Sequence, residues 1–266
     1  MVQWRMAIIR KSRQEIELMR ASGRLVHEIL TAIRAAVKPG VSTGELDRIA
    51  DEMIGSAGAE ALFKGQKTAQ AKMPYPSAIC ASVNEEVVHG IPGPRALDAG
   101  DIVSVDVGVR LNGYCGDSAV TIPVGEVSPQ AQRLMEVTRH LLEIAMEQMG
   151  PGRRWSEVAG KMQASAEQAG FSVVRDFVGH GIGREMWEDP KVPNFVDRRH
   201  RQNDIHLEPG LVLAVEPMVN AGTSKVQYAP DGLGWTVVTR DGKLAAHFEH
   251  TLAVTEDGVE VLTDGR

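Results

Sequence analysis

The 266-residue chain has few cysteines, few aromatic residues and no excess of positive charge. Cys80 and Cys115 are its only cysteines, which excludes a framework of disulfides and suits a reducing compartment. The formal net charge is −6, whereas nucleic-acid-binding proteins need an excess of Lys and Arg. No apolar run is long enough for a signal peptide or a membrane span. We therefore expect a cytoplasmic protein that binds neither nucleic acid nor membranes directly.

The rest of the composition is that of an ordinary folded domain. Hydrophobic residues make up 43% of the chain and charged residues 24%, which excludes wholesale disorder. No linker rich in Pro, Gly or Ser divides the sequence, so we expect one catalytic or binding domain over 1–266, and a monomer. The basic run Arg198-Arg199-His200-Arg201 is short and indicates a solvated loop rather than a contact with the ribosome or an acidic partner.

The sequence predicts four helices and at least seven strands. A capping box at Ser12 and Glu15 begins a helix that must end before Pro39-Gly40. Apolar spacing predicts further helices over 43–57, 129–149 and 155–169. Short aliphatic runs predict strands over 77–83, 102–109, 119–124, 171–178, 211–215, 235–239 and 251–254. This mixture of elements predicts an α/β (α+β) fold.

The element order and several residues occur twice along the chain. The matching segments are 89–91 with 180–182, 100–106 with 210–216, and 117–120 with 249–252. Four matches in the same order, including the Pro-Gly pairs that precede Glu45 and Glu157, are hard to attribute to chance. We interpret the chain as two homologous halves, about 12–125 and 129–262, that share one sheet and one core around an approximate two-fold axis.

Each half contributes one histidine followed by two acidic residues near an apolar strand: His89, Asp106 and Asp117, then His180, Glu216 and Glu249. An ionised carboxylate that leaves an apolar strand needs a cation or a strong hydrogen-bond network. Asp106 and Glu216 each end an apolar run of this kind. Four carboxylates and one or two imidazoles around a two-fold axis suit two divalent metal ions.

The spacing within the first half supports this interpretation. Asn112-Gly113 is a strong signal for a two-residue hairpin turn. With that turn, residue 117 faces residue 108, and Asp106 and Asp117 lie diagonally on the same face of the sheet. We interpret the histidines outside the repeat as structural or exposed: His27, His140, His200, His206 and His247.

Five motifs resemble those of the methionine aminopeptidases of peptidase family M24, in the short bacterial form called type I. They are HGIPG (89–93), DVGVRLNGYCGDSAV (106–120), GHGIGREMWEDP (179–190), VEPMVNAG (215–222) and FEHT (248–251). The resemblance covers residues 12 to 262. It implies the pita-bread fold, in which two pseudo-symmetric halves surround a curved antiparallel sheet. It also implies a hydrolase that removes the N-terminal methionine from nascent proteins and peptides with a water activated by two divalent ions (Co, Mn, Fe or Zn).

The resemblance also implies roles for individual residues. Asp106, Asp117, His180, Glu216 and Glu249 would be the metal ligands, and Glu216 would also be the general base. His89 would contact the scissile amide and the tetrahedral intermediate without binding metal. The methionine side chain would lie in a pocket formed by Tyr75, Cys80 and Trp235, with Met186 and Trp187 on the substrate side. A Met side chain gains from such polarisable and aromatic surroundings.

Three departures from the family pattern lie on the substrate side. Trp187 stands where the family usually has a second substrate-contacting histidine, and an indole donates one hydrogen bond but carries no proton at neutral pH. Met186 replaces the usual aromatic residue, and Lys72-Met73-Pro74 replaces an aromatic-His-Gly sequence. Losing one preorganised contact to the transition state costs roughly 10²–10³ in rate.

These departures leave alternatives open. Three interpretations fit the sequence: a slow methionine aminopeptidase, a related aminopeptidase with shifted specificity, and a scaffold that keeps the metals and binds N-termini with little turnover. The intact set of acids favours the first two. Prolidases and aminopeptidases that act before proline share the ligand set, but they usually carry an additional N-terminal domain and resemble this chain less. A metal-free protein- or RNA-binding scaffold of the same fold would have lost acidic ligands.

Overall fold

The computed structural model describes residues 8–197, 202 and 204–266. The basic run 198–201 lies outside the described residues. No helix in the described part of the chain has the length and apolar character needed to cross a membrane.

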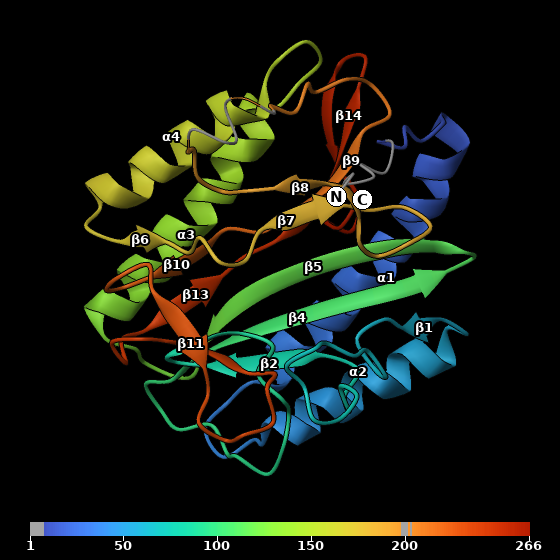
Figure 1. Ribbon diagram of the computed structural model, residues 1–266. Helices are drawn as coiled ribbons and strands as arrows, with labels where there is room; N and C mark the ends of the chain where they lie inside the picture. Colours follow the sequence, from blue (N-terminus) through green and yellow to red (C-terminus); the bar gives the residue numbers. More distant parts are fainter. Residues whose placement is uncertain (1–7, 198–201, 203) are drawn as a thin grey trace.

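The four expected helices are present, with bounds within one or two residues of those predicted: α1 (Arg13–Ala36), α2 (Thr43–Ser56), α3 (Pro129–Gln148) and α4 (Trp155–Gln168). Ser12 caps α1 and Ser42 caps α2, each through a capping box with the glutamate three residues later. This arrangement satisfies amides that the first turn of a helix leaves without a partner. The helix α1 packs on the β4–β5 hairpin beside α2, whereas α3 packs with α4 beside β10 and β13 (Figure 1).

The strands form four antiparallel groups: a four-stranded sheet in which β4 pairs with β1, β2 and β5, a five-stranded sheet of order β15-β14-β9-β7-β8, and two three-stranded sheets, β13-β10-β6 and β11-β12-β3. Their bounds are β1 (Glu60–Ala61), β2 (Cys80–Val83), β3 (Glu86–Val88), β4 (Ile102–Leu111), β5 (Tyr114–Pro123), β6 (Ser172–Val173), β7 (Gly179–Gly181), β8 (Glu188–Val192), β9 (Val212–Val215), β10 (Met218–Asn220), β11 (Val226–Tyr228), β12 (Val237–Thr239), β13 (Ala245–His247), β14 (His250–Thr255) and β15 (Gly258–Val261).

The hairpin of β4 and β5 confirms the prediction made from its turn. Asn112 and Gly113 both have positive φ, 53° and 79°, as a two-residue turn that matches the strand twist requires. Gly108 pairs with Asp117 in the register expected. The strand β4 begins at the predicted residue and continues to Leu111, two residues beyond the predicted end. Asp106 therefore lies in the middle of a paired strand and projects from its face.

The predicted strand over 171–178 is much shorter in the structure. Only Ser172–Val173 pairs with β10. The exposed residues Arg175 and Asp176 interrupt the apolar run, and Phe177 and Val178 leave the sheet to line a cavity. Apolar character alone did not distinguish sheet pairing from cavity lining here.

The two halves of the molecule meet along β5 and β14. The Glu249 amide donates to the Ala119 carbonyl oxygen over 2.9 Å, and the Ser118 hydroxyl donates to the Glu249 carbonyl oxygen over 2.5 Å. The Thr251 hydroxyl donates to the Asp117 carbonyl oxygen over 2.8 Å. These bonds hold Asp117 of one half beside Glu249 of the other. The junction agrees with two repeats, over 12–125 and 129–262, that are related by a two-fold axis. The division into these repeats within one domain over 1–266 stays a prediction.

Candidate metal centre and substrate cavity

A cavity of about 190 Å³ lies between the two halves and contains all of the site residues predicted from the sequence. Those lining residues are Tyr75, Cys80, His89, Asp106, Asp117, His180, Met186, Trp187, Glu216, Trp235 and Glu249. They come from both halves of the chain, so the cavity exists only when the halves are packed together.

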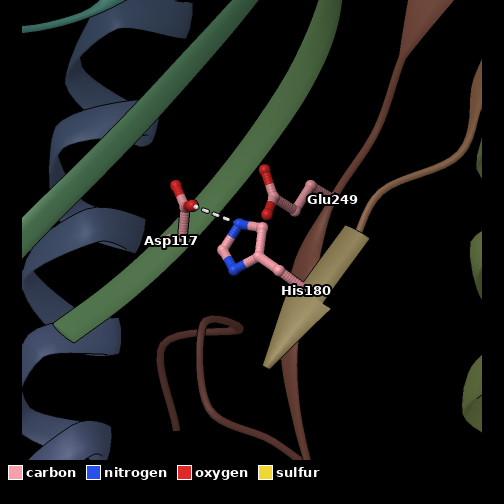
Figure 2. A group of neighbouring side chains, drawn as sticks. All are labelled: Asp117, His180 and Glu249. Atoms are coloured by element: carbon pink, nitrogen blue, oxygen red, sulfur yellow. Dashed lines mark ion pairs between the residues drawn. The ribbon is translucent and has the colours of Figure 1, made fainter. Parts of the chain in front are cut away.

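A cluster of buried acids and one imidazole lies in this cavity. Asp117 on β5, His180 on β7 and Glu249 beside β14 point toward one another (Figure 2), and one ligand-capable atom of each lies within 4.8 Å of the others. The Nε2 atom of His180 is 3.8 Å from Asp117 Oδ2 and 3.7 Å from Glu216 Oε1. His180 Nδ1 lies 3.0 Å from the Gly181 carbonyl oxygen. A proton on Nδ1 satisfies that carbonyl and leaves the Nε2 lone pair directed at the acids.

Two further acids complete the cluster. Asp106 projects from β4, where it pairs with Cys80 of β2, and lines the cavity beside Asp117. Glu216 follows β9, and its carbonyl oxygen accepts a bond of 3.0 Å from the Asn194 side chain. Its own side chain is 14% exposed, so it reaches the open part of the cavity. The four carboxylates thus come from four separate backbone segments around one small volume.

The burial and mutual repulsion of the carboxylates in this cluster favour the binding of divalent cations. Burial raises the pKa of Asp106 to about 7 and that of Glu216 to about 8, and it raises the pKa values of Asp117 and Glu249 well above the ordinary range. Neighbouring carboxylates raise the last two further. Within the described residues, Oδ1 of both aspartates and Oε1 of Glu249 are buried without a hydrogen-bond partner. Buried acids whose oxygens have no donor need positive charge, and four carboxylates with one imidazole are a donor set that divalent metal ions accept.

His89 lines the same cavity but lies outside the three-residue cluster. Its backbone has a φ of 59°, and its ring packs edge-on against Phe177 with 5.5 Å between the ring centres. Burial lowers the pKa of His89 to about 4, so the ring is neutral at neutral pH. A neutral imidazole that faces the cavity has one donor and one acceptor to offer to a bound amide.

The apolar part of the cavity is formed by aromatic rings whose polar atoms are already satisfied. The Tyr75 hydroxyl lies 2.8 Å from the Gly90 carbonyl oxygen, and the Trp235 indole donates to the Met73 carbonyl oxygen over 2.9 Å. The two rings meet edge to face at 5.1 Å. Cys80 and Met186 are buried beside them. This surface offers aromatic carbon and sulfur, which suit a thioether side chain.

The rim of the cavity differs from its interior. Among the lining residues that the structure describes, only Trp187 and Lys191 are exposed. Trp187 is 45% exposed, and its ring centre lies 6.4 Å from that of His180. The indole therefore stands beside the metal-ligating imidazole that we infer, and no imidazole occupies its position.

His247, interpreted from the sequence as structural or exposed, is buried in the structure. Several lining residues were not predicted: Phe63, Gln66, Val88, Phe177, Val178, Lys191 and Met218. His247 is 2% exposed, and its Nε2 atom, which has no hydrogen-bond partner in the described structure, lies 3.7 Å from Glu216 Oε2. Burial lowers the pKa of His247 to about 3. Its spacing of two residues from Glu249 was the available signal, because alternate residues of an extended segment share a face.

Comparisons with known proteins agree with this geometry. The model of metallopeptidase family M24 matches residues 17–256. Methionine aminopeptidase 1 of Bacillus subtilis is 46% identical over 256 residues, which cover 96% of this chain and 99% of that protein. The methionine aminopeptidase of Escherichia coli K12 is 42% identical over 262 residues, which cover 97% of this chain and 94% of that protein.

Solved structures show the same relationship. The methionine aminopeptidase of Rickettsia prowazekii superimposes with a TM-score of 0.90 at 37% identity, covering 97% of this chain and 100% of that chain. The methionine aminopeptidase of Thermotoga maritima gives a TM-score of 0.90 at 41% identity, covering 97% and 99% of the two chains. An Xaa-Pro dipeptidase of Bacillus anthracis shares the fold, with a TM-score of 0.75 at 21% identity over 97% of this chain and 63% of that one.

Proposed function

The chain belongs to metallopeptidase family M24 and has its pita-bread fold, and we propose that it removes the N-terminal methionine from proteins and peptides. It is a metalloexopeptidase, a hydrolase of the terminal peptide bond. The observation that carries the proposal is the buried cluster of Asp117, His180 and Glu249 in a cavity whose other wall is aromatic and sulfur-rich. Hydrolytic groups and a pocket suited to a methionine side chain are thus within one small volume.

Five residues are proposed to hold two divalent ions: Asp106, Asp117, His180, Glu216 and Glu249. The buried oxygens without donors support this assignment, because bound cations would supply the missing positive charge. Two such ions would lower the pKa of a water and polarise the scissile carbonyl. Oxygen-rich coordination with one imidazole suits Mn, Fe, Co or Zn.

The protein's own groups perform the proton transfers and the positioning. Glu216 is the proposed general base, which accepts the proton of the attacking water and returns a proton to the leaving amine. Its side chain is suited to this role because it reaches the open cavity while burial disfavours its charged form. His89 is proposed to hold the scissile amide and the tetrahedral intermediate by a hydrogen bond from its neutral ring.

The pocket residues determine which side chain enters. Tyr75, Cys80, Met186 and Trp235 are proposed to enclose the methionine side chain, and Trp187 to contact the chain beyond it. Because the substrates are nascent chains, we propose action in the cytoplasm as a monomer, with access to chains that leave the ribosome. The two buried free cysteines agree with a reducing compartment.

A second candidate is an aminopeptidase of shifted specificity or low turnover. It is favoured by one observation, the indole of Trp187 at the rim, where its ring lies 6.4 Å from His180. An indole offers an apolar wall and one hydrogen-bond donor, so it stabilises a developing charge less well than an imidazole does.

Methionine release from a Met-Ala-Ser peptide tests the proposal. The protein is stripped of metal and reloaded separately with Mn²⁺, Fe²⁺ and Co²⁺. We expect metal-dependent release that Glu216→Gln abolishes and that Glu256→Gln, in an exposed turn, leaves unchanged. Protein that binds metal and releases no methionine from this peptide would contradict methionine removal, and a panel of other N-terminal residues would then distinguish shifted specificity from a binding scaffold.

A further inference from the structure

We propose that Lys191 selects substrates with an acidic side chain in the two residues that follow the N-terminal methionine. This inference rests on the proposed function, because it concerns the part of the peptide that lies beyond the scissile bond. Lys191 belongs to the cavity lining but not to the set of residues assigned above.

The position of Lys191 follows from the sheet register. It lies on β8 directly opposite His180 of β7. Paired residues of neighbouring strands project from the same face of a sheet, so the lysine side chain rises on the side of the metal-ligating imidazole that we infer. Lys191 and His180 both line the cavity, in agreement with this register.

The exit path of the substrate follows from burial. The acids of the cluster and the aromatic pocket are enclosed, whereas Trp187 and Lys191 are the exposed members of the described lining. A peptide whose first side chain fills the enclosed pocket must therefore continue past the indole and the ammonium group. The two side chains are four positions apart in sequence and form the contact surface for the residues after methionine.

With divalent ions bound to the cavity acids, the charge balance would leave Lys191 able to bind an anion. Four carboxylates, Asp106, Asp117, Glu216 and Glu249, line the cavity, and two divalent ions would compensate their charge. Lys191 carries the only permanent positive charge in the described lining. The charge of Lys191 lowers the pKa of Glu216, an acid whose charge bound cations would compensate. A carboxylate of the passing peptide is the group that this lysine can bind.

The expected size of the effect is modest because the site is exposed. An ion pair in contact with solvent changes an equilibrium or rate roughly two- to fivefold, and salt weakens it. We therefore expect kcat/KM to be roughly two- to fivefold higher for an acidic peptide than for its amide counterpart. The preference should shrink as ionic strength rises.

The test compares C-terminally amidated peptides that differ in one charge: Met-Ala-Asp against Met-Ala-Asn, and Met-Asp-Ala against Met-Asn-Ala. The metal-loaded wild type should prefer the acidic member of at least one pair. Lys191→Gln should remove the preference, and Lys191→Glu should reverse it. Lys161→Gln, the same charge change on the outer helix α4, should behave as the wild type does.

Other results would overturn the inference. Equal rates within both peptide pairs for the wild type would overturn it. A Lys191→Gln variant that slows acidic and neutral peptides alike would also overturn it, because the lysine would then act on the site carboxylates rather than on the substrate. A loss of preference in Lys161→Gln would show an effect of net charge alone. Release from the neutral peptides keeps the proposed function separate, because its absence in the wild type would contradict methionine removal itself.

Discussion

The interior and the rim of the cavity differ in burial and in the secondary structure that carries their side chains. The interior consists of buried side chains on paired strands, with Asp117 and Glu249 linked through the β5–β14 junction. The rim is the segment 183–191, which leaves the sheet after β7, returns as β8 and exposes Trp187 and Lys191. The interior acids lie on or beside paired strands, whereas the rim combines an irregular turn over 183–187 with the strand β8. The groups that we propose for catalysis and for holding the methionine side chain thus lie in the interior, and the rim is proposed to contact the residues that follow.

Removing an acid from the interior should have the largest effect. Glu249→Gln keeps the shape of the side chain but removes one charge, so we expect the rate of methionine release to fall by about 10³-fold or more. Asp257→Asn, in an exposed turn eight residues along, is the matched control and should leave the rate unchanged. A Glu249→Gln enzyme within tenfold of the wild type would mean that the interior acids are not the catalytic centre.

A buried ion pair is one attachment of the rim, and breaking it should cost stability. Lys11 Nζ lies 2.6 Å from Glu188 Oε2, and both side chains are almost fully buried. The Glu188 Oε1 atom accepts a bond of 3.3 Å from the Glu185 amide, which closes the turn that carries Met186 and Trp187. Lys11→Met leaves an unpaired buried carboxylate, so we expect a loss of about 3–5 kcal/mol in the free energy of unfolding, measured by urea denaturation.

The neighbouring ion pair provides the control for this experiment. Arg10 pairs with Glu208, and both side chains are well exposed. Arg10→Met should therefore cost about 0–1 kcal/mol. Equal losses from the two substitutions would contradict the view that the N-terminal segment anchors the rim through a buried charge.

The pH dependence of stability should separate the metal-free from the metal-loaded protein. In the metal-free protein, Asp106 and Glu216 hold protons up to about pH 7 and 8, whereas they release them near pH 4 when unfolded. The native state then binds more protons, and stability falls as pH rises. Between about pH 4 and 6.5 this trend is opposed, because burial lowers the pKa values of His89, His180 and His250 to about 4, so the unfolded chain binds their protons instead.

The net fall is therefore expected between about pH 6.5 and 8, where the histidines are neutral in both states. Each proton held only by the native state contributes about 1.4 kcal/mol per pH unit. Thermal melts at half-unit steps of pH check this, and Mn²⁺ should abolish the fall because the cations replace the protons. Metal-free protein that becomes more stable from pH 6.5 to 8 would contradict the assigned protonation of the interior.

Restoring an imidazole at the rim should have the smallest effect. Trp187→His provides a group that can donate, accept and carry a proton, so we expect kcat/KM for Met-Ala-Ser to rise by up to about tenfold. Trp187→Phe, which removes the indole donor and adds no imidazole, should give no increase. Metal content should be unchanged in both variants. No gain from histidine, with an unchanged substrate profile, would mean that the rim residue does not limit turnover.

Local signals in the sequence predicted much of this molecule. The capping box at Ser12 and the Asn112-Gly113 turn depend on residues within a few positions of each other, so this helix start and the hairpin register could be predicted directly. The matched His and acid residues of the two halves identified the interior of the cavity. The assignment of ligands, base and pocket residues stays a prediction that the geometry supports.

The features that sequence reasoning missed depend on contacts between distant segments. His247 is buried beside Glu216 because β13 pairs with β10, and the sequence did not predict this pairing. Lys11 and Glu188 are 177 residues apart and look like ordinary surface charges in the sequence. Lys191 reaches the cavity only through the register of β8 with β7. Burial and pairing at long range are set by the packed fold rather than by local pattern.

The number of metal ions bound per chain tests most directly the claim that the interior acids, and not the rim residues, hold the metal ions. The protein is stripped with chelator, reloaded with Mn²⁺, freed of unbound ions by gel filtration and analysed by atomic emission. The account predicts about two ions per chain for the wild type and for Trp187→His, and fewer for Glu249→Gln. The same ratio in all three proteins, or a loss of metal in the rim variant alone, would contradict it.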